Sequence, residues 1–451
     1  MRSMFKSVQA VRGKPLCGEI TVPGDKSISH RALIISSIAI GTSKISGILE
    51  GADVLTTKRA MQALGATIEC FEDCVWSIVG RGVGGLRAPN SVLDLGNSGT
   101  TARLLMGLLS THNFNTILTG DASLCKRPMD RVIIPLRMMG GDFESDSRYK
   151  LPLTVKGNLE TLPINYKLPM ASAQVKSAII LAGLNAPGST VVSEPIASRD
   201  HTENLLRAFG ANIRVEELGD GARSIAVEGQ PELKGTEISI PGDISSAAFP
   251  LVAALIVPNS KVKIVNVGIN PLRIGLINVL SAMGGKITIT NKREKNGELI
   301  GDIEAKSSSL RGVRVSANDV PAMIDEFPIL AVAAAFASGE TRMEGLSELR
   351  IKESDRLLVI ANSLTKLGIK VEIGDDWLIV SGVKDDGCLP EGGSQISVEL
   401  DHRIAMSFLV MGLASSKPIS IDDYRPVVTS FPNFAEKMQE LGADLSMDLC
   451  R

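Results

Sequence analysis

Residues 22–31 read Val-Pro-Gly-Asp-Lys-Ser-Ile-Ser-His-Arg, and a similar turn returns at residues 240–247 as Ile-Pro-Gly-Asp-Ile-Ser-Ser-Ala. Each copy follows a short alternating strand pattern and precedes a run of small and aliphatic residues, so each is predicted to join a strand to a helix. Proline fixes φ, glycine permits a tight bend, and Asp or Ser can cap the helix that follows. Only the first copy carries Lys26, Ser27 and Arg31. The pattern predicts a duplicated scaffold with one charged copy.

The composition favours an α/β protein of two domains. A chain of 451 residues is too long for one ordinary core, and its 43 glycines and 4% aromatic residues suit helices that pack closely. The net charge of −2 provides no field that would attract nucleic acid or an anionic membrane. No apolar run is long enough for a signal peptide or a bilayer span. We therefore expect a cytoplasmic protein with neither kind of partner.

A unit of strand, helix, strand, helix and strand recurs six times, at intervals of about 70 to 84 residues. In each unit a buried apolar helix comes first, and a second, amphipathic helix stops at a glycine. Three units in each half would make two domains, and the two Pro-Gly-Asp turns would be the places where the chain crosses between them. Two crossings also form a hinge pair that can close around a ligand. The buried helices are predicted to begin near Ser27, Ser98, Ala171, Ser245, Ile324 and Asp401, and the amphipathic helices to stop at Gly65, Gly140, Gly210, Gly284, Gly368 and Gly442.

Polar residues interrupt the repeat at the starts of the buried helices and in nearby turns. Helix N-termini present free amides and a positive dipole end, and Arg adds a planar fork for carboxylate or phosphate. If pseudo-symmetry makes these termini converge, they form one cleft for small, highly anionic substrates. The clusters are Lys26-Ser27 with Arg31, residues 97–100, Lys126-Arg127, residues 172–174, residues 198–201, Asp325-Glu326, residues 352–356 and residues 401–403.

Each cluster alone also has a purely structural interpretation. Lys26-Ser27 fits a helix cap beside a solvated charge, and Asp325-Glu326 fits a capping pair. Lys352 and Arg356 are spaced like neighbours on an exposed helix face, and residues 401–403 could hold a local ion pair. Their recurrence at equivalent places in the repeat favours a common site.

Several familiar site motifs are missing from the sequence. It contains no Gly-x4-Gly-Lys-Ser/Thr loop and no Gly-x-Ser-x-Gly elbow, and its four histidines lack metal-ligand spacing. The six cysteines have neither zinc-like nor disulfide-like spacing. These absences favour a metal-free site that works by acid–base catalysis and cationic electrostatics.

At the polar clusters the sequence resembles the 5-enolpyruvylshikimate-3-phosphate (EPSP) synthase family, in the family's order and over nearly the whole chain. The resemblance implies the two-domain enolpyruvyl transferase fold, an inside-out α/β barrel of six βαβαββ repeats with pseudo-threefold symmetry in each domain. One domain is expected over 22–242, with the Lys26, Arg127 and Ser172 side of the cleft. The other, discontinuous over 1–21 and 243–451, carries the Asp325, Glu353 and Arg403 side. The matching stretches are PGDKSISHRA (23–32), LGNSGTTARLL (95–105), KRPM (126–129), ASAQVKSA (171–178), SRDHTE (198–203), PGDISSAAF (241–249), IDEFP (324–328), LRIKESDRL (349–357) and DHRIAM (401–406).

The resemblance implies transfer of the enolpyruvyl group of phosphoenolpyruvate to the 5-hydroxyl of shikimate-3-phosphate, in the shikimate pathway toward chorismate and the aromatic amino acids. Addition of the hydroxyl gives a tetrahedral intermediate, which then eliminates phosphate. The family implies no cofactor and no metal, and it is usually monomeric.

The resemblance also implies roles for individual residues. Asp325 resembles the carboxylate that takes the hydroxyl proton, while Lys26 and Glu353 resemble the pair that handles protons at the methylene carbon and the leaving phosphate. The implied phosphoenolpyruvate contacts are Lys26, Gly99, Arg127, Gln174, Arg356 and Arg403. The implied shikimate-3-phosphate contacts are Ser27, Arg31, Ser172, Ala173, Gln174, Ser198, Arg199, Asp325 and Lys352.

The sequence also departs from the family's pattern. Many members carry a Lys just before a Thr-Phe-Pro near the C-terminus, whereas residues 427–432 read Val-Val-Thr-Ser-Phe-Pro, so one basic contact has no counterpart. The stretches GDKS, SAQVK and RDHTE resemble the bacterial subgroup that is less sensitive to the inhibitor glyphosate. Gly99 stands where strongly tolerant members of that subgroup can carry Ala. Residues 270–273 read Asn-Pro-Leu-Arg, whereas the subgroup usually has Asn-Pro-Thr-Arg. Both degrees of glyphosate sensitivity therefore stay open.

Two other functions compete with this interpretation. The UDP-N-acetylglucosamine 1-carboxyvinyltransferase family shares the fold and the donor, but it places a reactive Cys where this chain has Ala122, and Lys-Asn where this chain has Lys26-Ser27. A non-catalytic anion-binding scaffold would bind the phosphate ligands without releasing phosphate. An assay with both substrates separates all three.

Overall fold

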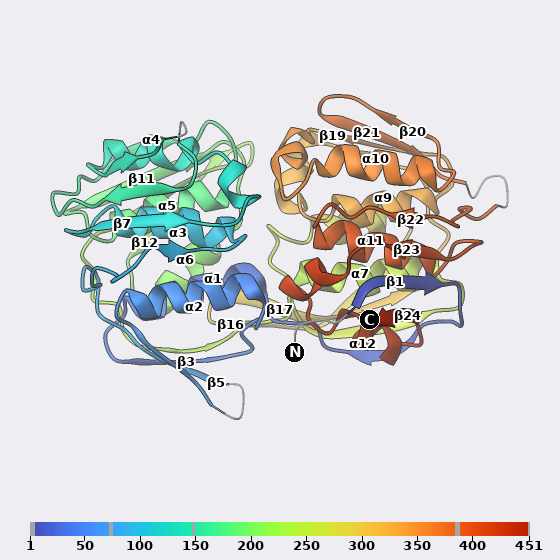
Figure 1. The fold of residues 1–451 in the computed structure, drawn as a ribbon, viewed down its shortest axis with the longest axis horizontal. Coiled ribbons are helices and arrows are strands. Elements are labelled where there is room, and N and C mark those ends of the chain that lie inside the picture. The colour runs from blue at the N-terminus through green and yellow to red at the C-terminus, as the bar shows by residue number, and fades with distance from the viewer. Residues whose placement is uncertain (1–4, 72–74, 147–148, 384–387, 450–451) are drawn as a thin grey trace. The chain divides into compact units, whose positions relative to one another are not determined.

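A computed structural model describes residues 5–71, 75–146, 149–383 and 388–449 (Figure 1). The chain divides into two units. The Lys26 unit contains Gly24–Ile240 and Glu294–Glu298, and the Asp325 unit contains Met1–Pro23, Pro241–Arg293 and Leu299–Arg451. Both Pro-Gly-Asp turns lie at a boundary between the units. The short segment at 294–298 is a further exchange of chain that the repeat pattern does not predict.

The described residues form six four-stranded sheets, three in each unit. Each sheet has one parallel pair at its edge and an antiparallel neighbour next to that pair, so one topology is repeated. In the Lys26 unit the sheets are β14(Glu237–Ser239)-β3(Thr42–Ser46)-β5(Val75–Val79)-β4(Thr67–Cys70), β6(Leu93–Asp94)-β7(Asn115–Thr119)-β9(Leu153–Lys156)-β8(Asp142–Glu144) and β10(Asn165–Lys167)-β11(Ser189–Glu194)-β13(Ala222–Glu228)-β12(Ile213–Gly219). In the Asp325 unit they are β2(Cys17–Ile20)-β15(Lys261–Gly268)-β17(Glu298–Lys306)-β16(Lys286–Lys295), β18(Arg314–Val315)-β19(Glu340–Glu344)-β21(Trp377–Ser381)-β20(Val371–Ile373) and β22(Gln395–Ile396)-β23(Ile419–Ile421)-β1(Phe5–Val11)-β24(Asp444–Leu449).

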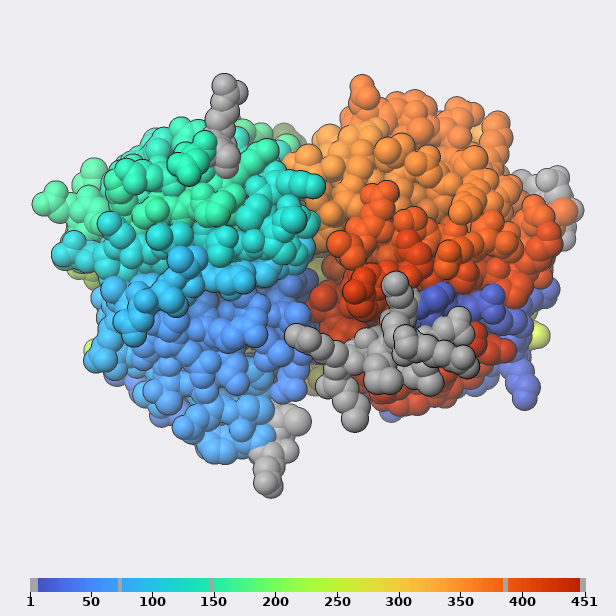
Figure 2. Space-filling view, viewed as in Figure 1, coloured from blue at the N-terminus to red at the C-terminus, as the bar shows by residue number. Residues whose placement is uncertain are grey.

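The two ends of the chain meet in one of these sheets. Strand β1 pairs antiparallel with both β23 and β24, so N-terminal residues complete a sheet of the C-terminal repeat. In the space-filling view, blue N-terminal residues accordingly lie beside red C-terminal ones (Figure 2). Residues from the two ends of the chain therefore share one sheet.

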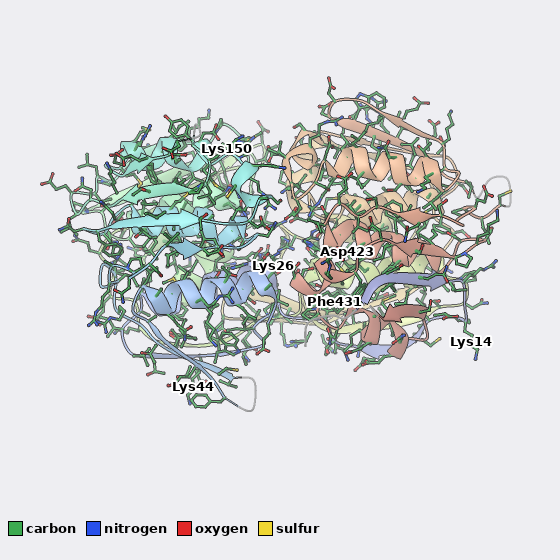
Figure 3. All side chains as sticks on the ribbon, in the orientation of Figure 1. Lys14, Lys26, Lys44, Lys150, Asp423 and Phe431 are labelled. Atoms are coloured by element: carbon green, nitrogen blue, oxygen red, sulfur yellow. The ribbon has the colours of Figure 1, made fainter. Side chains whose placement is uncertain are left out.

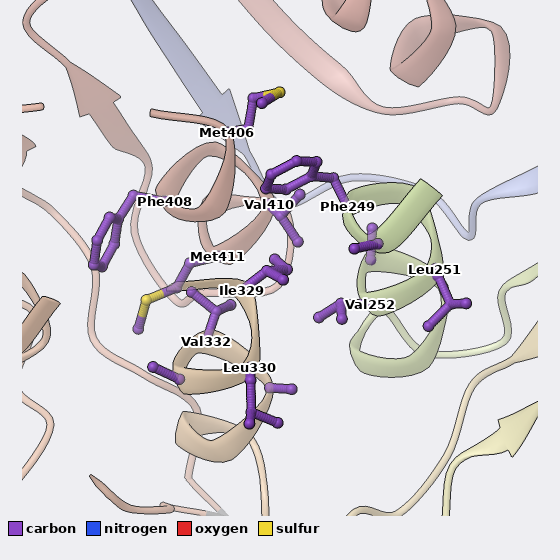
Figure 4. Close-up of a cluster of buried hydrophobic side chains, with 14 of the residues drawn as sticks. Phe249, Leu251, Val252, Ile329, Leu330, Val332, Met406, Phe408, Val410 and Met411 are labelled. Carbon is purple, nitrogen blue, oxygen red and sulfur yellow. The ribbon is translucent and has the colours of Figure 1, made fainter. Parts of the chain in front are cut away.

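Apolar helices form the core of each unit. Helices α7(Ile244–Ile256), α9(Phe327–Ala335) and α11(His402–Gly412) pack against one another, and the side chains of Phe249, Ile329 and Val410 fill the space between them (Figure 4). In the Lys26 unit, α3(Gly99–Leu109) packs on α1(Lys26–Ser37) and on α5(Ala173–Gly183). The second helices of the repeats are α2(Ala52–Ala63), α4(Asp130–Met138), α6(His201–Ala208), α8(Gly275–Ala282), α10(Arg356–Lys366) and α12(Phe434–Glu440), and the 3-10 turns are η1(Leu124–Lys126), η2(Ala317–Ala322), η3(Ser347–Ile351) and η5(Arg425–Thr429).

The predicted helix ends are largely confirmed. All six predicted stop glycines have φ between 83° and 101°, the left-handed conformation that a glycine adopts without strain. Five buried helices begin within two residues of the predicted starts. The exception is α9, which begins at Phe327 rather than near Ile324, because the preceding turn closes with a bond from the Glu326 amide to the Met323 carbonyl.

The first Pro-Gly-Asp turn needs its glycine for a different reason from the predicted one. Gly24 is not in the left-handed region, but a Cβ placed on it would lie 1.8 Å from the Gly47 carbonyl oxygen. The glycine therefore permits a close backbone approach rather than a special φ. The predicted cap is present, since the Asp25 side chain accepts a bond from the Ile28 amide, and Asp243 does the same for Ser245 in the second copy.

The tip of the β16–β17 hairpin belongs to the Lys26 unit. Glu298 accepts a hydrogen bond from His201 Nδ1 at 2.7 Å, and both side chains are buried. Asn296 bonds to the backbone of β14 through both its amide nitrogen and its amide oxygen.

In the part of the chain that the structure describes, no helix combines the length and the apolar character needed to cross a bilayer.

Candidate active site

Lys26 opens α1 and is not a free surface charge. Figure 3 labels its side chain. Its Nζ lies 2.5 Å from Asp53 Oδ2, a carboxylate at the start of α2, and the side chain is only 20% exposed. Asp25 rather than Ser27 supplies the helix cap. The structural interpretation of Lys26-Ser27 as a cap beside a solvated charge is therefore wrong.

Arg31, one turn further along α1, is buried and links three helices. It donates from Nε to Thr202 Oγ1 at 2.6 Å and from a terminal nitrogen to Ser177 Oγ at 2.8 Å. The other terminal nitrogen donates to the Ser27 carbonyl at 3.1 Å. These bonds fix the guanidinium between α1, α5 and α6.

The start of α3 contacts the turn that carries Arg127. Arg127 donates to Asn97 Oδ1 at 2.6 Å, and a Cβ added at Gly99 would lie 3.1 Å from its other terminal nitrogen. Gln174 donates from Nε2 to Thr100 Oγ1 at 3.0 Å, which ties the start of α5 to the start of α3. The structure thus brings three of the predicted anion-binding segments together within the Lys26 unit.

Ser198 belongs to a buried network that sequence analysis missed. It donates to Glu194 Oε2 at 2.6 Å, while Lys176 Nζ donates to Glu194 Oε1 at 3.0 Å and to the Ser198 carbonyl at 3.1 Å. Glu203 lies 2.8 Å from the same ammonium group. Burial by itself would lower the pKa of Lys176, but the Glu203 and Glu194 carboxylates hold it above its usual value. The matching stretch ASAQVKSA contains Lys176 and was the available signal.

Several other predicted contacts lie at half-buried helix starts in the same unit. Ser172 caps α5 by accepting a bond from the Val175 amide, and Ala173 is the first residue of that helix. Arg199 is half-buried, directly after Ser198 and before the start of α6. Ser172, Ala173 and Arg199 are thus all half-buried residues at or just before the start of a helix.

In the Asp325 unit, three cations surround the carboxylate of Asp325. Arg356 lies 3.3 Å and Lys352 lies 3.8 Å from Oδ1, and Arg403 lies 3.9 Å from Oδ2. They come from α10, the turn before it and α11. The interpretation of Lys352 and Arg356 as neighbours on an exposed helix face is wrong, because α10 begins only at Arg356 and that side chain is 1% exposed.

Arg356 itself is held by three carboxylates. Its Nε lies 2.7 Å from Asp401 Oδ2, and a terminal nitrogen lies 2.6 Å from Glu353 Oε2. Burial alone would lower the pKa of Arg356, but Asp401, Glu353 and Asp325 hold it above its usual value. For the acidic Asp401, burial alone would raise the pKa, but the positive charge of Arg356 holds that pKa below its usual range. Asp401 therefore pairs with Arg356, and the local ion pair considered for residues 401–403 is not formed with Arg403.

Three side chains of kinds that can bind a metal ion also lie close together, away from the residues described above. Atoms of Asp200, His201 and Glu298 lie within 4.8 Å of one another among the described residues. The His201 ring and the Glu298 carboxylate bond directly to each other, and Asn204 donates to both Asp200 and Glu298. These hydrogen bonds account for the grouping.

Comparison with solved structures defines the class of fold. The chain aligns with the enolpyruvyl transferase NikO from Streptomyces tendae at a TM-score of 0.78 and 18% identity, over 98% of this chain and 99% of that one, which shows the fold alone. It aligns with an EPSP synthase structure from Acinetobacter baumannii at a TM-score of 0.85 and 44% identity, over 98% of this chain and all of that one. The protein therefore has the two-domain enolpyruvyl transferase fold.

Sequence comparisons identify the family within that class. A family model described as EPSP synthase (3-phosphoshikimate 1-carboxyvinyltransferase) matches residues 11–438. A 3-phosphoshikimate 1-carboxyvinyltransferase of Paramagnetospirillum magneticum is 54% identical over 445 residues, 99% of each chain. Another, of Granulibacter bethesdensis, is 55% identical over 428 residues, 95% of this chain and 94% of that relative. The chain belongs to the EPSP synthase family.

Proposed function

We propose that this protein is a 3-phosphoshikimate 1-carboxyvinyltransferase of the shikimate pathway. It transfers the enolpyruvyl group of phosphoenolpyruvate to the 5-hydroxyl of shikimate-3-phosphate and releases phosphate. Full-length similarity to relatives with that name supports the reaction. The single structural observation that carries it is the convergence of Lys352, Arg356 and Arg403 on Asp325, which combines a carboxylate base with cations that suit anionic substrates.

In the proposed mechanism, Asp325 accepts the proton of the attacking 5-hydroxyl. Lys26 and Glu353 handle the protons at the methylene carbon and at the leaving phosphate, and the C–O bond to phosphate breaks as the tetrahedral intermediate collapses. Three neighbouring cations favour the ionised form of Asp325 and so make it a weak base. Removing water and holding the hydroxyl against the carboxylate compensate for that weakness.

The binding roles follow the same division of charge. Phosphoenolpyruvate is assigned to Lys26, Gly99, Arg127, Gln174, Arg356 and Arg403. Shikimate-3-phosphate is assigned to Ser27, Arg31, Ser172, Ala173, Gln174, Ser198, Arg199, Asp325 and Lys352. Multiple hydrogen bonds hold Arg31 and Arg127 in fixed positions, and a guanidinium held in this way loses little conformational entropy when it binds an anion.

Phosphate release in the presence of both substrates tests the function. We expect Asp325→Asn to lower kcat by about 10²- to 10⁴-fold, the usual contribution of a general base. Lys26→Ala should lose most turnover as well. Asp376→Asn, at an exposed carboxylate of the same unit, is the matched control and should behave as wild type. Phosphate release with UDP-N-acetylglucosamine instead of shikimate-3-phosphate, or no release with either acceptor, would refute the proposal.

Individual motifs bear on the response of the protein to glyphosate. The motifs GDKS, SAQVK and RDHTE support membership of the bacterial subgroup that is less sensitive to glyphosate, while Gly99 lacks the methyl group that strongly tolerant members can carry at this position. Glyphosate inhibition measured against phosphoenolpyruvate tests the assignment, and tight competitive inhibition contradicts it. We propose a cytoplasmic monomer, and light scattering that gave twice the 47.8 kDa chain mass would contradict the monomer.

A further inference from the structure

The second Pro-Gly-Asp turn carries no cation, yet it is the centre of a buried polar network. Ser245, two residues after Asp243, accepts a hydrogen bond from Arg273 at 2.8 Å and donates its own proton to Glu326 Oε1. Arg273 also lies 3.6 Å from Asp243 Oδ1. All four side chains are buried. The uncharged copy of the turn thus holds a carboxylate in a fixed place.

Glu326 in turn contacts Arg403, which is one of the predicted substrate contacts. One terminal nitrogen of Arg403 lies 3.4 Å from Glu326 Oε1 and donates to the Asp325 carbonyl at 3.2 Å. The other terminal nitrogen lies 3.9 Å from Asp325 Oδ2. Arg403 is therefore shared between two adjacent carboxylates, and Glu326 is the buried one.

Helix capping does not account for Glu326. Although it is the residue before α9, its side chain makes no capping hydrogen bond. The side chain is 1% exposed, and among the described residues none donates to its second oxygen. Burying a carboxylate oxygen without a donor costs stability. A role toward Arg403 therefore explains the group better than a role in local stability.

We propose that Glu326, held by Ser245, which Arg273 in turn fixes, is a positioning residue. It fixes Arg403 and offsets part of the positive charge that Arg403 places beside Asp325. The inference rests on the proposed function. Asp325 faces Lys352, Arg356 and Arg403, and all three favour its ionised, less basic form. The Glu353 and Asp401 carboxylates act on Asp325 through Arg356. Glu326, the next residue in the chain after Asp325, adds a negative charge that opposes the effect of these cations on Asp325.

Glu326→Gln is the principal test, because it keeps the shape and removes the charge. Arg403 then loses one ionic partner, so we expect KM for phosphoenolpyruvate to rise about tenfold, equivalent to one charge-assisted contact. KM for shikimate-3-phosphate should stay within about twofold, since Arg403 is assigned only to the donor. Loss of a neighbouring negative charge favours ionised Asp325, so the acid limb of the kcat/KM profile should move to lower pH. A merely structural role would not move that limb.

A second pair of variants tests the link to the turn. Ser245→Ala should raise KM for phosphoenolpyruvate in the same direction, and Ser245→Thr, which keeps the hydroxyl, should restore it. The effects of Ser245→Ala and Glu326→Gln should not add in the double variant, because both act through one contact. Glu304→Gln is the matched control, as Glu304 pairs only with lysines on β15 and β17 in the ion pairs of the described residues.

The outcomes are distinct from those that test the reaction itself. Wild-type enzyme that releases no phosphate overturns the proposed function before any variant is made. If wild type turns over and Glu326→Gln keeps both its KM for phosphoenolpyruvate and its pH limb, the positioning role is wrong. Should Glu326→Gln fail to fold by circular dichroism, Ser245→Ala carries the same test. An unchanged KM in that folded variant overturns the role of the turn.

Discussion

Arg356 and Asp401 form a buried ion pair, with Nε and Oδ2 2.7 Å apart and side chains 1% and 0% exposed. The pair joins the first residue of α10 to the residue that caps α11. Asp401 also accepts a bond from the Arg403 amide. One carboxylate therefore orders two of the cations that approach Asp325.

Asp401→Asn should be strongly destabilising. Breaking one partner out of a buried pair costs about 3–5 kcal/mol, because the remaining charge stays buried. Urea unfolding followed by circular dichroism measures the change. Glu372→Gln, in the exposed pair between Lys370 and Glu372, is the control and should change stability by less than about 1 kcal/mol. Equal effects of the two variants would show that the buried pair contributes nothing special.

Stability should fall as the pH drops below neutral because of His30. Burial lowers the pKa of His30 to about 3, against 6.5 for the free side chain, so the folded protein disfavours the protonated ring. A lowered pKa of this kind gives stability that is complete above pH 6.5 and is lost as pH falls toward 3. Between pH 7 and pH 5 the loss from this residue should be about 2 kcal/mol.

His30→Gln separates that contribution from those of other groups. The variant cannot be protonated there, and its amide can still bond to Thr57, the present partner of His30 Nδ1. Its unfolding free energy, measured in urea at pH 7 and pH 5, should therefore fall by about 2 kcal/mol less than that of wild type. Identical slopes for the two proteins would contradict the assignment.

Glu194 should affect the binding of shikimate-3-phosphate through its hydrogen bond with Ser198. The Ser198 hydroxyl has one proton and gives it to Glu194, while Lys176 holds the same carboxylate and the Ser198 carbonyl. We expect Glu194→Gln to raise KM for shikimate-3-phosphate several-fold, with KM for phosphoenolpyruvate unchanged. In a Ser198→Ala background the same substitution should add little. Additive effects would mean that Glu194 acts elsewhere. Glu217→Gln is the control, because Glu217 is an exposed carboxylate that lines a cavity of about 270 Å³ together with Glu194.

Gly99→Ala should weaken phosphoenolpyruvate binding. The added methyl group would lie 3.1 Å from an Arg127 nitrogen and 2.7 Å from an Arg103 nitrogen, so both side chains must shift. Because Arg127 is assigned to the donor, KM for phosphoenolpyruvate should rise several-fold while KM for shikimate-3-phosphate changes little. Gly219→Ala, where a methyl group meets nothing within 4 Å, is a control for insertion of the methyl group, although its positive φ will cost some stability. Unchanged donor kinetics in Gly99→Ala would contradict this placement of Arg127.

Sequence reasoning succeeded where the signal is local. The capping of α1 by Asp25 involves residues three apart, and the stop at Gly65 depends on one backbone conformation. Such features require only the residues of one helical turn, so a linear pattern contains them. The motif matches also selected Asp325 and Arg356, whose contact spans 31 residues, but they gave no geometry.

The sequence did not predict the contacts between distant segments. Nothing near Glu298 indicates that it bonds to His201, 97 residues away, and nothing near Lys176 indicates that it holds Glu194. Ser245 and Glu326 are 81 residues apart. These pairs depend on which buried surfaces meet after the helices and sheets pack, and packing is a property of the whole chain.

The sequence by itself therefore determined the repeating unit, the helix ends, the family and the residue types of the candidate site, because periodicity and turn chemistry depend on neighbouring residues. Tertiary structure alone decided which carboxylate each cation faces and which hydroxyl or carbonyl fixes it. The physical reason is that burial makes each unpaired charge costly, so the fold must supply partners for Arg356, Lys176 and Glu326 from segments far along the chain.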